Sequence, residues 1–197
     1  LITFARGAMV KPLDVIAERN DGDVAARRNG TRISFLPDRE IFEETDFTAA
    51  TLSQRLRETA FLTRALRIVL RDERAGGQTV EFHYEGGIRD FVSHVNESKE
   101  PVHKHVVFFE GGSEQGNVEV AMQWNTSYVE SVFTFANNIN TTEGGAHEEG
   151  FRAALTTLVN KFARTWNILK EKDANLSGED IREGLTAIIS VRLREPQ

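Results

Sequence analysis

The chain has 197 residues, which fits a single domain able to bury roughly 70% of the surface of its unfolded form. It contains no cysteine, which excludes disulfides and thiolate metal sites, and no apolar stretch approaches the length needed to cross a bilayer. The net charge of −6 argues against an autonomous DNA-binding module, because such modules carry a surplus of cations. This composition fits a cytoplasmic protein with no membrane partner.

The first 37 residues of the chain contain few signals of regular structure. Residues 9–16 are predicted to be extended, and residues 17–29 are polar, charged and rich in turn formers, which is typical of a loop. Residues 30–37 alternate, with Ile33 and Phe35 on one face, and therefore predict a strand.

A helix is predicted over residues 47–65, because Leu52, Leu56 and Ala60 recur on one face at helical spacing. A hairpin and a second, short helix are predicted after it, over residues 66–71, 79–84 and 87–95.

The second half of the chain mixes strands with one long helix. Strands are predicted over residues 106–109, 118–124 and 132–135, the first two joined by a glycine-rich turn (Gly111, Gly112, Gly116). The long helix begins near His147, and its apolar residues form one stripe: Phe151, Leu155, Leu158, Phe162, Trp166 and Leu169. Residues 185–193 form the closing strand. This order predicts an α/β or α+β fold.

Three motifs do not reduce to core packing. The first is NNINTTEGGAHEEGFRAAL, from Asn137 to Leu155, in which paired amides lead through Gly144-Gly145 into the long helix. The others are YEGGI, starting at Tyr84, and GEDIREGLTAIISV, starting at Gly178. In this order they resemble the transducer domain of the DNA gyrase B family, the second domain of its ATPase region.

The resemblance implies a four-stranded sheet backed by helices, with a left-handed βαβ crossover, as in the GHMP kinases and a small-ribosomal-subunit protein. It covers residues 30–197 as one transducer domain, whereas residues 1–29 match only loosely. The implied function is to couple ATP binding and hydrolysis in a separate GHKL domain to DNA strand passage and negative supercoiling. The implied partners are DNA and the gyrase A protein, with homodimerisation through the GHKL domain.

In that family an arginine at the position of Arg152 faces a DNA-filled cavity between protomers, so the resemblance makes Arg152 the candidate DNA contact. On residue chemistry alone, Arg152 is a solitary cation that forms a surface ion pair with Glu148 or Glu149.

The ATP and magnesium of the whole enzyme are expected to bind outside this chain, which has no Gly-x-Gly lid. The lysine loop that senses the γ-phosphate in this family would lie beyond Gln197. The chain alone is therefore predicted to be inactive, within an enzyme that is an ATP-dependent type IIA topoisomerase. A topoisomerase IV transducer, a kinase-like enzyme and a nucleic-acid-binding module on the same fold are the alternatives.

Other candidate sites have simpler explanations. His103 and His105, with Glu100 nearby, offer too few ligands for zinc, so no metal site is predicted. Gly144-Gly145 is a poor phosphate site beside three glutamates and is better interpreted as a turn. Glu179, Asp180 and Glu183 fit a helix start better than acid–base chemistry, so no catalytic residue is predicted. Trp124 and Trp166 are predicted core anchors.

Overall fold

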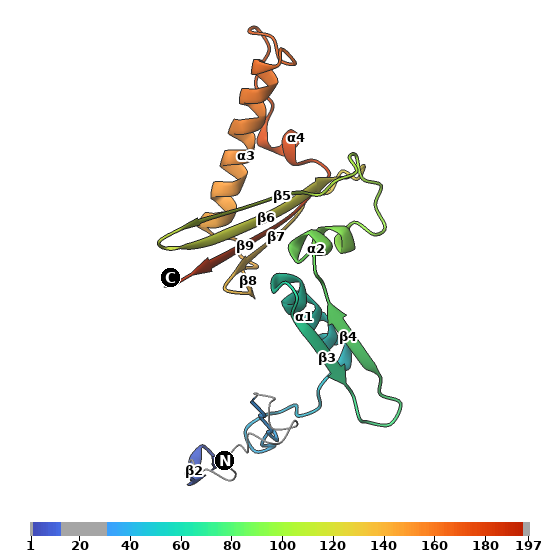
Figure 1. Cartoon of the computed structure of the whole chain (residues 1–197), viewed down its shortest axis with the longest axis vertical. Coiled ribbons are helices and arrows are strands. Elements are labelled where there is room, and N and C mark those ends of the chain that lie inside the picture. Colours follow the sequence, from blue (N-terminus) through green and yellow to red (C-terminus); the bar gives the residue numbers. More distant parts are fainter. Residues whose placement is uncertain (1, 13–30, 195–197) are drawn as a thin grey trace, which may run out of the picture. The chain divides into compact units, whose positions relative to one another are not determined.

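The computed structural model describes residues 2–12 and 31–194 (Figure 1). The chain divides into two compact units, Leu1–Thr48 and Ala49–Gln197, and each is described by itself. Neither boundary of the predicted domains, at residues 29 and 30, falls within the described residues, so that division stays a prediction.

The first unit contains one small hairpin. Strands β1 (Thr3–Ala5) and β2 (Ala8–Lys11) pair antiparallel through a turn at Arg6-Gly7, both with positive φ. The extended segment predicted over residues 9–16 is confirmed as far as Lys11. The predicted loop over residues 17–29 lies outside the described residues.

The strand predicted over residues 30–37 is wrong for residues 31–37, which have no strand structure. Ile33 and Phe35 are both exposed. An alternating pattern makes a strand only when a neighbouring strand supplies hydrogen bonds, and none lies beside these residues in the described part of the chain.

The second unit opens with a helix and a hairpin. Helix α1 (Ala49–Leu62) begins two residues later than predicted and buries Ala60, Phe61 and Leu62. Strands β3 (Arg67–Arg71) and β4 (Thr79–His83) form the predicted antiparallel pair. Helix α2 (Ile88–Val95) follows as expected.

A five-stranded mixed sheet forms the centre of the second unit. Its strands, in the order β5-β6-β9-β7-β8, are Val107–Ser113, Gly116–Trp124, Leu185–Leu193, Ser131–Ala136 and Ile139–Asn140. The predicted sheet backed by helices is confirmed, with one strand more than the four expected, the short β8. Gly111 and Gly112 lie within β5, not in the turn.

Strand β9 is the middle strand, and Leu185–Val191 are all buried. It pairs antiparallel with β6 and parallel with β7. A parallel pair requires a crossover, and here it consists of α3 (Ala146–Thr165) and the short α4 (Gly178–Arg182). The left-handedness of this crossover stays a prediction.

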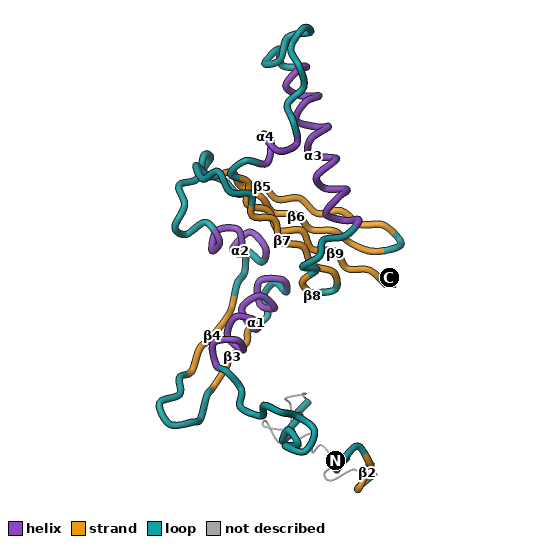
Figure 2. The backbone as a smooth tube through the Cα atoms, turned by 180° about the vertical axis from the view of Figure 1, so that it is seen from behind, coloured by secondary structure: helices purple, strands orange, loops and turns teal. Residues whose placement is uncertain are grey.

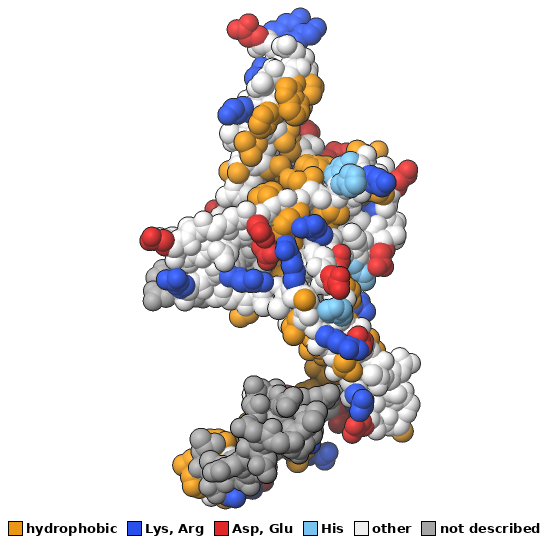
Figure 3. All heavy atoms as spheres, in the orientation of Figure 1, with side chains coloured by type: hydrophobic (Ala, Val, Ile, Leu, Met, Phe, Trp, Pro, Cys, Tyr) orange, Lys and Arg blue, Asp and Glu red, His pale blue; other side chains and the backbone are white. Residues whose placement is uncertain are grey.

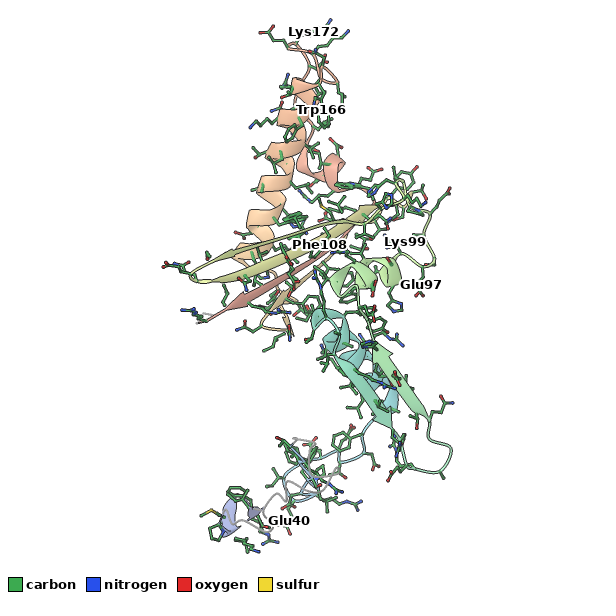
Figure 4. All side chains as sticks on the ribbon, viewed as in Figure 1. Glu40, Glu97, Lys99, Phe108, Trp166 and Lys172 are labelled. Carbon is green, nitrogen blue, oxygen red and sulfur yellow. The ribbon has the colours of Figure 1, made fainter. Side chains whose placement is uncertain are left out.

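The helices cover both faces of the sheet, with α1 and α2 on one side and α3 and α4 on the other (Figures 1 and 2). The first face is aromatic, with Phe61 stacked between Tyr84 and Phe91 at centroid distances of 3.8 and 4.7 Å. The guanidinium groups of Arg64 and Arg89 lie 4.8 and 4.3 Å from the ring centroid of Phe108. Figure 4 marks the position of Phe108 on the sheet. The second face packs Leu155 and Ile181 against Leu185 and Ala187.

The apolar stripe of α3 is only partly buried, contrary to the prediction. Leu155 is 7% exposed, whereas Leu158, Phe162 and Trp166 are 49%, 44% and 69% exposed. Figure 3 shows hydrophobic side chains gathered along this helix, and Figure 4 places Trp166 near its end. Trp166 is therefore not a core anchor. Trp124 is partly buried and packs against the core beside α3, and its Nε1–H donates to the Ile181 carbonyl at 2.8 Å.

Candidate functional site

The paired amides of the first motif form a tight turn. Asn137 and Asn138 have φ values of 50° and 66° and link β7 to β8, which is the geometry of a two-residue hairpin. The Asn137 side chain accepts from the Leu193 amide at 2.9 Å and donates to the Leu193 carbonyl at 3.0 Å. The turn therefore fixes the end of the central strand.

The Gly144-Gly145 pair redirects the chain into α3, as the turn interpretation predicts. Its φ values are 78° and 152°, which favour glycine. A Cβ on Gly144 would lie 3.1 Å from Glu148 Oε2, and one on Gly145 would lie 3.0 Å from the His147 ring. The two glycines therefore leave room for the side chains of the first helical turn.

A polar chain connects that turn to the sheet. His147 Nε2 lies 3.1 Å from Thr141 Oγ1, which is 2.7 Å from Thr134 Oγ1 on β7. Thr134 Oγ1 in turn lies 3.4 Å from Glu148 Oε2. His147 and Glu148 are thereby fixed in position by side chains on neighbouring elements.

Arg152 lies one helical turn further along and contacts two carboxylates. Its Nε donates to Glu148 Oε1 at 3.0 Å, its Nη2 lies 2.9 Å from the same oxygen, and its Nη1 lies 2.6 Å from Glu130 Oε1. The pairing with Glu148 was one of the two predicted, whereas Glu130 was missed. Its position just before β7 carries no sequence signal.

Arg152 is not a solitary cation, because the fold brings Arg182 into the same cluster. Arg182 Nε donates to Glu130 Oε1 at 3.1 Å, so one oxygen binds two guanidinium groups. We call Glu130, Glu148, Arg152 and Arg182 the arginine–glutamate cluster. Its two positive and two negative charges balance, and it joins α3, α4 and the residue preceding β7.

Two of the three acidic residues of the third motif, Glu179 and Asp180, lie in the first turn of α4, as predicted, whereas Glu183 is its C-cap and not part of the helix start. Ser177 is the N-cap of α4, and its hydroxyl accepts from the Asp180 amide at 3.1 Å. The Asp180 carboxylate accepts from the Ser177 amide at 3.2 Å, which completes a capping box.

His103 has a structural role. Its Nδ1–H donates to the His105 carbonyl at 2.8 Å, which leaves Nε2 to accept from the Trp124 amide at 3.1 Å. Residues 102–105 form bends and not the strand on which the two rings would share a face. Within residues 2–12 and 31–194, no group of three or more His, Cys, Asp or Glu side chains is arranged to hold a metal.

The family model described as DNA gyrase B matches residues 87–197. The DNA gyrase B protein of Clostridium acetobutylicum is 49% identical over 196 residues, which cover 99% of this chain and 30% of the relative. The chain belongs to the DNA gyrase B family. The predicted family is thereby confirmed. The gyrase B protein of Streptococcus pyogenes is 50% identical over 98% of this chain and 29% of the relative.

Solved structures of gyrase B share the fold. The 43K ATPase domain of Thermus thermophilus gyrase B, in complex with an aminocoumarin, has a TM-score of 0.82 and 34% identity, over 100% of this chain and 52% of that one. The topoisomerase IV ATP-binding domain of Francisella tularensis, with a TM-score of 0.72 and 20% identity, shares the fold alone. The chain spans about 30% of the length of its gyrase relatives.

No helix in the described part of the chain is long and apolar enough to cross a membrane.

Proposed function

We propose that this chain acts as the transducer of a DNA gyrase B protein. In this role it couples ATP binding and hydrolysis in a GHKL domain to DNA strand passage and negative supercoiling. The observation that carries the proposal is the gyrase B match over residues 87–197, which contain the sheet, the crossover and the arginine–glutamate cluster.

A transducer has to move as one body, and the packing of the second unit supports this. Strand β9 carries core residues on both faces, with Ile188 in the aromatic core beside α2 and Leu185 and Ala187 in the core beside α3. Movement of either helix layer therefore displaces the same strand. Rigid-body transitions depend on such continuous packing.

Arg152 is the proposed DNA contact. Its side chain is 33% exposed and is held in place by Glu130 and Glu148. Within the described residues, its Nε–H donates a hydrogen bond to Glu148, and its Nη1 and Nη2 contacts to the two glutamates are ion pairs, so the guanidinium keeps N–H donors for a phosphate oxygen. Holding a guanidinium in one orientation reduces the entropy lost when it binds a phosphate.

ATP and magnesium belong to the whole enzyme in this proposal, and the described residues of this chain do not fit them. The glycine turn before α3 is lined by the Glu148 carboxylate, which would repel a phosphate. Among the described residues, no group of three or more His, Cys, Asp or Glu side chains is arranged to bind a metal ion. The proposed partners are DNA and the gyrase A protein, with homodimerisation through the GHKL domain in the cytoplasm.

The proposal can be tested by ATP hydrolysis in a full-length gyrase B protein, assembled with the gyrase A protein, in the presence and absence of linear DNA. Arg152→Gln is expected to reduce the DNA stimulation severalfold while basal hydrolysis stays unchanged. Lys161→Gln is the matched control, because it removes the same charge from an exposed position on the same helix. Full DNA stimulation in Arg152→Gln would contradict the assignment of Arg152.

A further inference from the structure

Glu130 holds a position that an anionic ligand of Arg152 would occupy. Its Oε1 atom lies 2.6 Å from Arg152 Nη1 and 3.1 Å from Arg182 Nε, between guanidinium groups carried by different helices. The Glu130 side chain is 27% exposed, so water reaches it. The Arg182 side chain is 12% exposed. Its Nη1 lies 2.7 Å from the position that a Cβ on Gly178 would take, so the glycine leaves room for this guanidinium group.

A carboxylate and a phosphodiester present the same features to arginine. Each is a monoanion with two terminal oxygens, and guanidinium groups bind both through paired N–H donors. The cluster is neutral with Glu130 in place. A phosphate added to the intact cluster would therefore face two carboxylates within the same few ångströms.

We propose that Glu130 is a positioning residue that occupies the DNA phosphate site, and that a backbone phosphate of DNA replaces it between Arg152 and Arg182. This inference rests on the proposed function. The exchange keeps the cluster neutral and returns the Glu130 carboxylate to water, which limits its cost. The backbone phosphate contributes affinity without sequence preference.

The exchange would also alter the connection between elements. Glu130 immediately precedes β7, and its carboxylate ties that strand to α3 and α4. When a phosphate takes its place, the two helices stay bridged to each other but lose the bridge that Glu130 makes to the start of β7. Thr134 on β7 still contacts Glu148, so DNA binding would weaken the connection between the sheet and the crossover at one point.

The test is the affinity of the 197-residue chain for a short fluorescent DNA duplex, measured by anisotropy at several salt concentrations. Glu130→Gln is expected to raise the affinity roughly three- to tenfold, because the duplex no longer competes with a carboxylate. Arg152→Gln should lower the affinity and reduce the slope of log affinity against log salt by about 1. The double variant should behave like Arg152→Gln, because the gain depends on that arginine.

Three controls separate exchange from simpler effects. Glu149→Gln removes an equal charge from an exposed position on α3 and should change the affinity by less than about twofold. Glu130→Asp keeps the carboxylate and should restore an affinity near that of the unaltered chain. Replacing chloride by inorganic phosphate at equal ionic strength should weaken duplex binding to Glu130→Gln by less than about twofold.

The outcomes distinguish the two proposals. An unchanged affinity in Arg152→Gln would remove Arg152 from the DNA site and with it the proposed function of that residue. A lower or unchanged affinity in Glu130→Gln, with Arg152→Gln impaired, would overturn the exchange alone. An equal gain in duplex affinity in Glu149→Gln would show that the effect comes from net charge alone. Strong competition by inorganic phosphate would show that the site binds the free ion and not the DNA backbone. Either result would overturn the exchange.

Discussion

The two halves of α3 carry the same apolar stripe but are held in different ways. In the first half, Ala146–Leu155, Leu155 packs into the core and Arg152 lies in the arginine–glutamate cluster. In the second half, Thr156–Thr165, Val159 still packs against this core, but Leu158 and Phe162 are exposed, and hydrogen bonds connect the helix to the following loop. The large apolar side chains of one stripe are thus buried at one end of the helix and mostly exposed at the other.

The second half is attached through its polar residues. Asn160 is buried and exchanges two hydrogen bonds with the Leu176 backbone, at 2.8 and 3.0 Å. Arg164 donates to the carbonyls of Lys170 and Asp173 at 3.0 and 2.9 Å. A helix of this length extends about 30 Å, and periodicity carries no information about how far the sheet reaches beneath it.

The largest expected effect separates two leucines of the same helix. Leu155→Ala is expected to lower the free energy of unfolding by about 2–4 kcal/mol, because Leu155 is buried against the sheet. Leu158→Ala, the same change at a half-exposed position, should cost less than about 1 kcal/mol. Urea denaturation of both variants measures the difference. Equal losses would mean that the two halves pack alike.

The hydrogen bonds of Asn160 predict the next largest effect. Asn160→Ala leaves the Leu176 amide and carbonyl without their side-chain partner and should cost about 1–3 kcal/mol. Thr157→Ala is the control, since its hydroxyl bonds only within the helix, to Ala153. If both variants unfold at the same denaturant concentration, Asn160 does not hold the second half in place.

A smaller effect is expected from the exposed aromatic pair. A fully buried Phe162 would cost roughly 3–5 kcal/mol on truncation, but its exposure reduces the expected cost of Phe162→Ala to less than about 1 kcal/mol. Its ring lies 5.5 Å from that of Trp166. A double-mutant cycle with Trp166→Ala should give a coupling of about 0.5–1 kcal/mol. A loss above about 3 kcal/mol would show that the side chain is buried in solution.

The smallest effect concerns a local ion pair outside α3, between Arg74 and Asp72. A side-chain hydrogen bond from Arg74 lowers the pKa of Asp72 from 3.8 to about 2. Because the pKa of Asp72 is lower in the folded state, the ion pair contributes to the free energy of unfolding. This contribution is complete above pH 3.8 and is lost as the pH falls towards about 2. In Arg74→Gln, the pKa of Asp72 should return towards 3.8, and a carboxyl NMR titration measures this change. An unchanged pKa would contradict the assigned cause.

Local patterns predicted those elements whose partners are close in sequence. The β3–β4 hairpin, α2 and the glycine turn before α3 all follow from turn residues and periodicity. The capping box of α4 is likewise contained within four residues.

The parts that sequence reasoning missed depend on distant neighbours. Residues 31–37 have a strand pattern without a neighbouring strand in the described part of the chain. Glu130 contacts Arg152 and Arg182 only because β7, α3 and α4 converge. Trp166 matches the stripe but extends beyond the sheet. Each error comes from tertiary context, which periodicity does not encode.

In the proposed role, this chain transmits force, and ATP chemistry takes place elsewhere in the enzyme. Isothermal titration calorimetry of the 197-residue chain with ATP and magnesium tests it most directly. No saturable heat of binding is expected. A saturable isotherm in the micromolar range would contradict it, because it would place a nucleotide site within these residues.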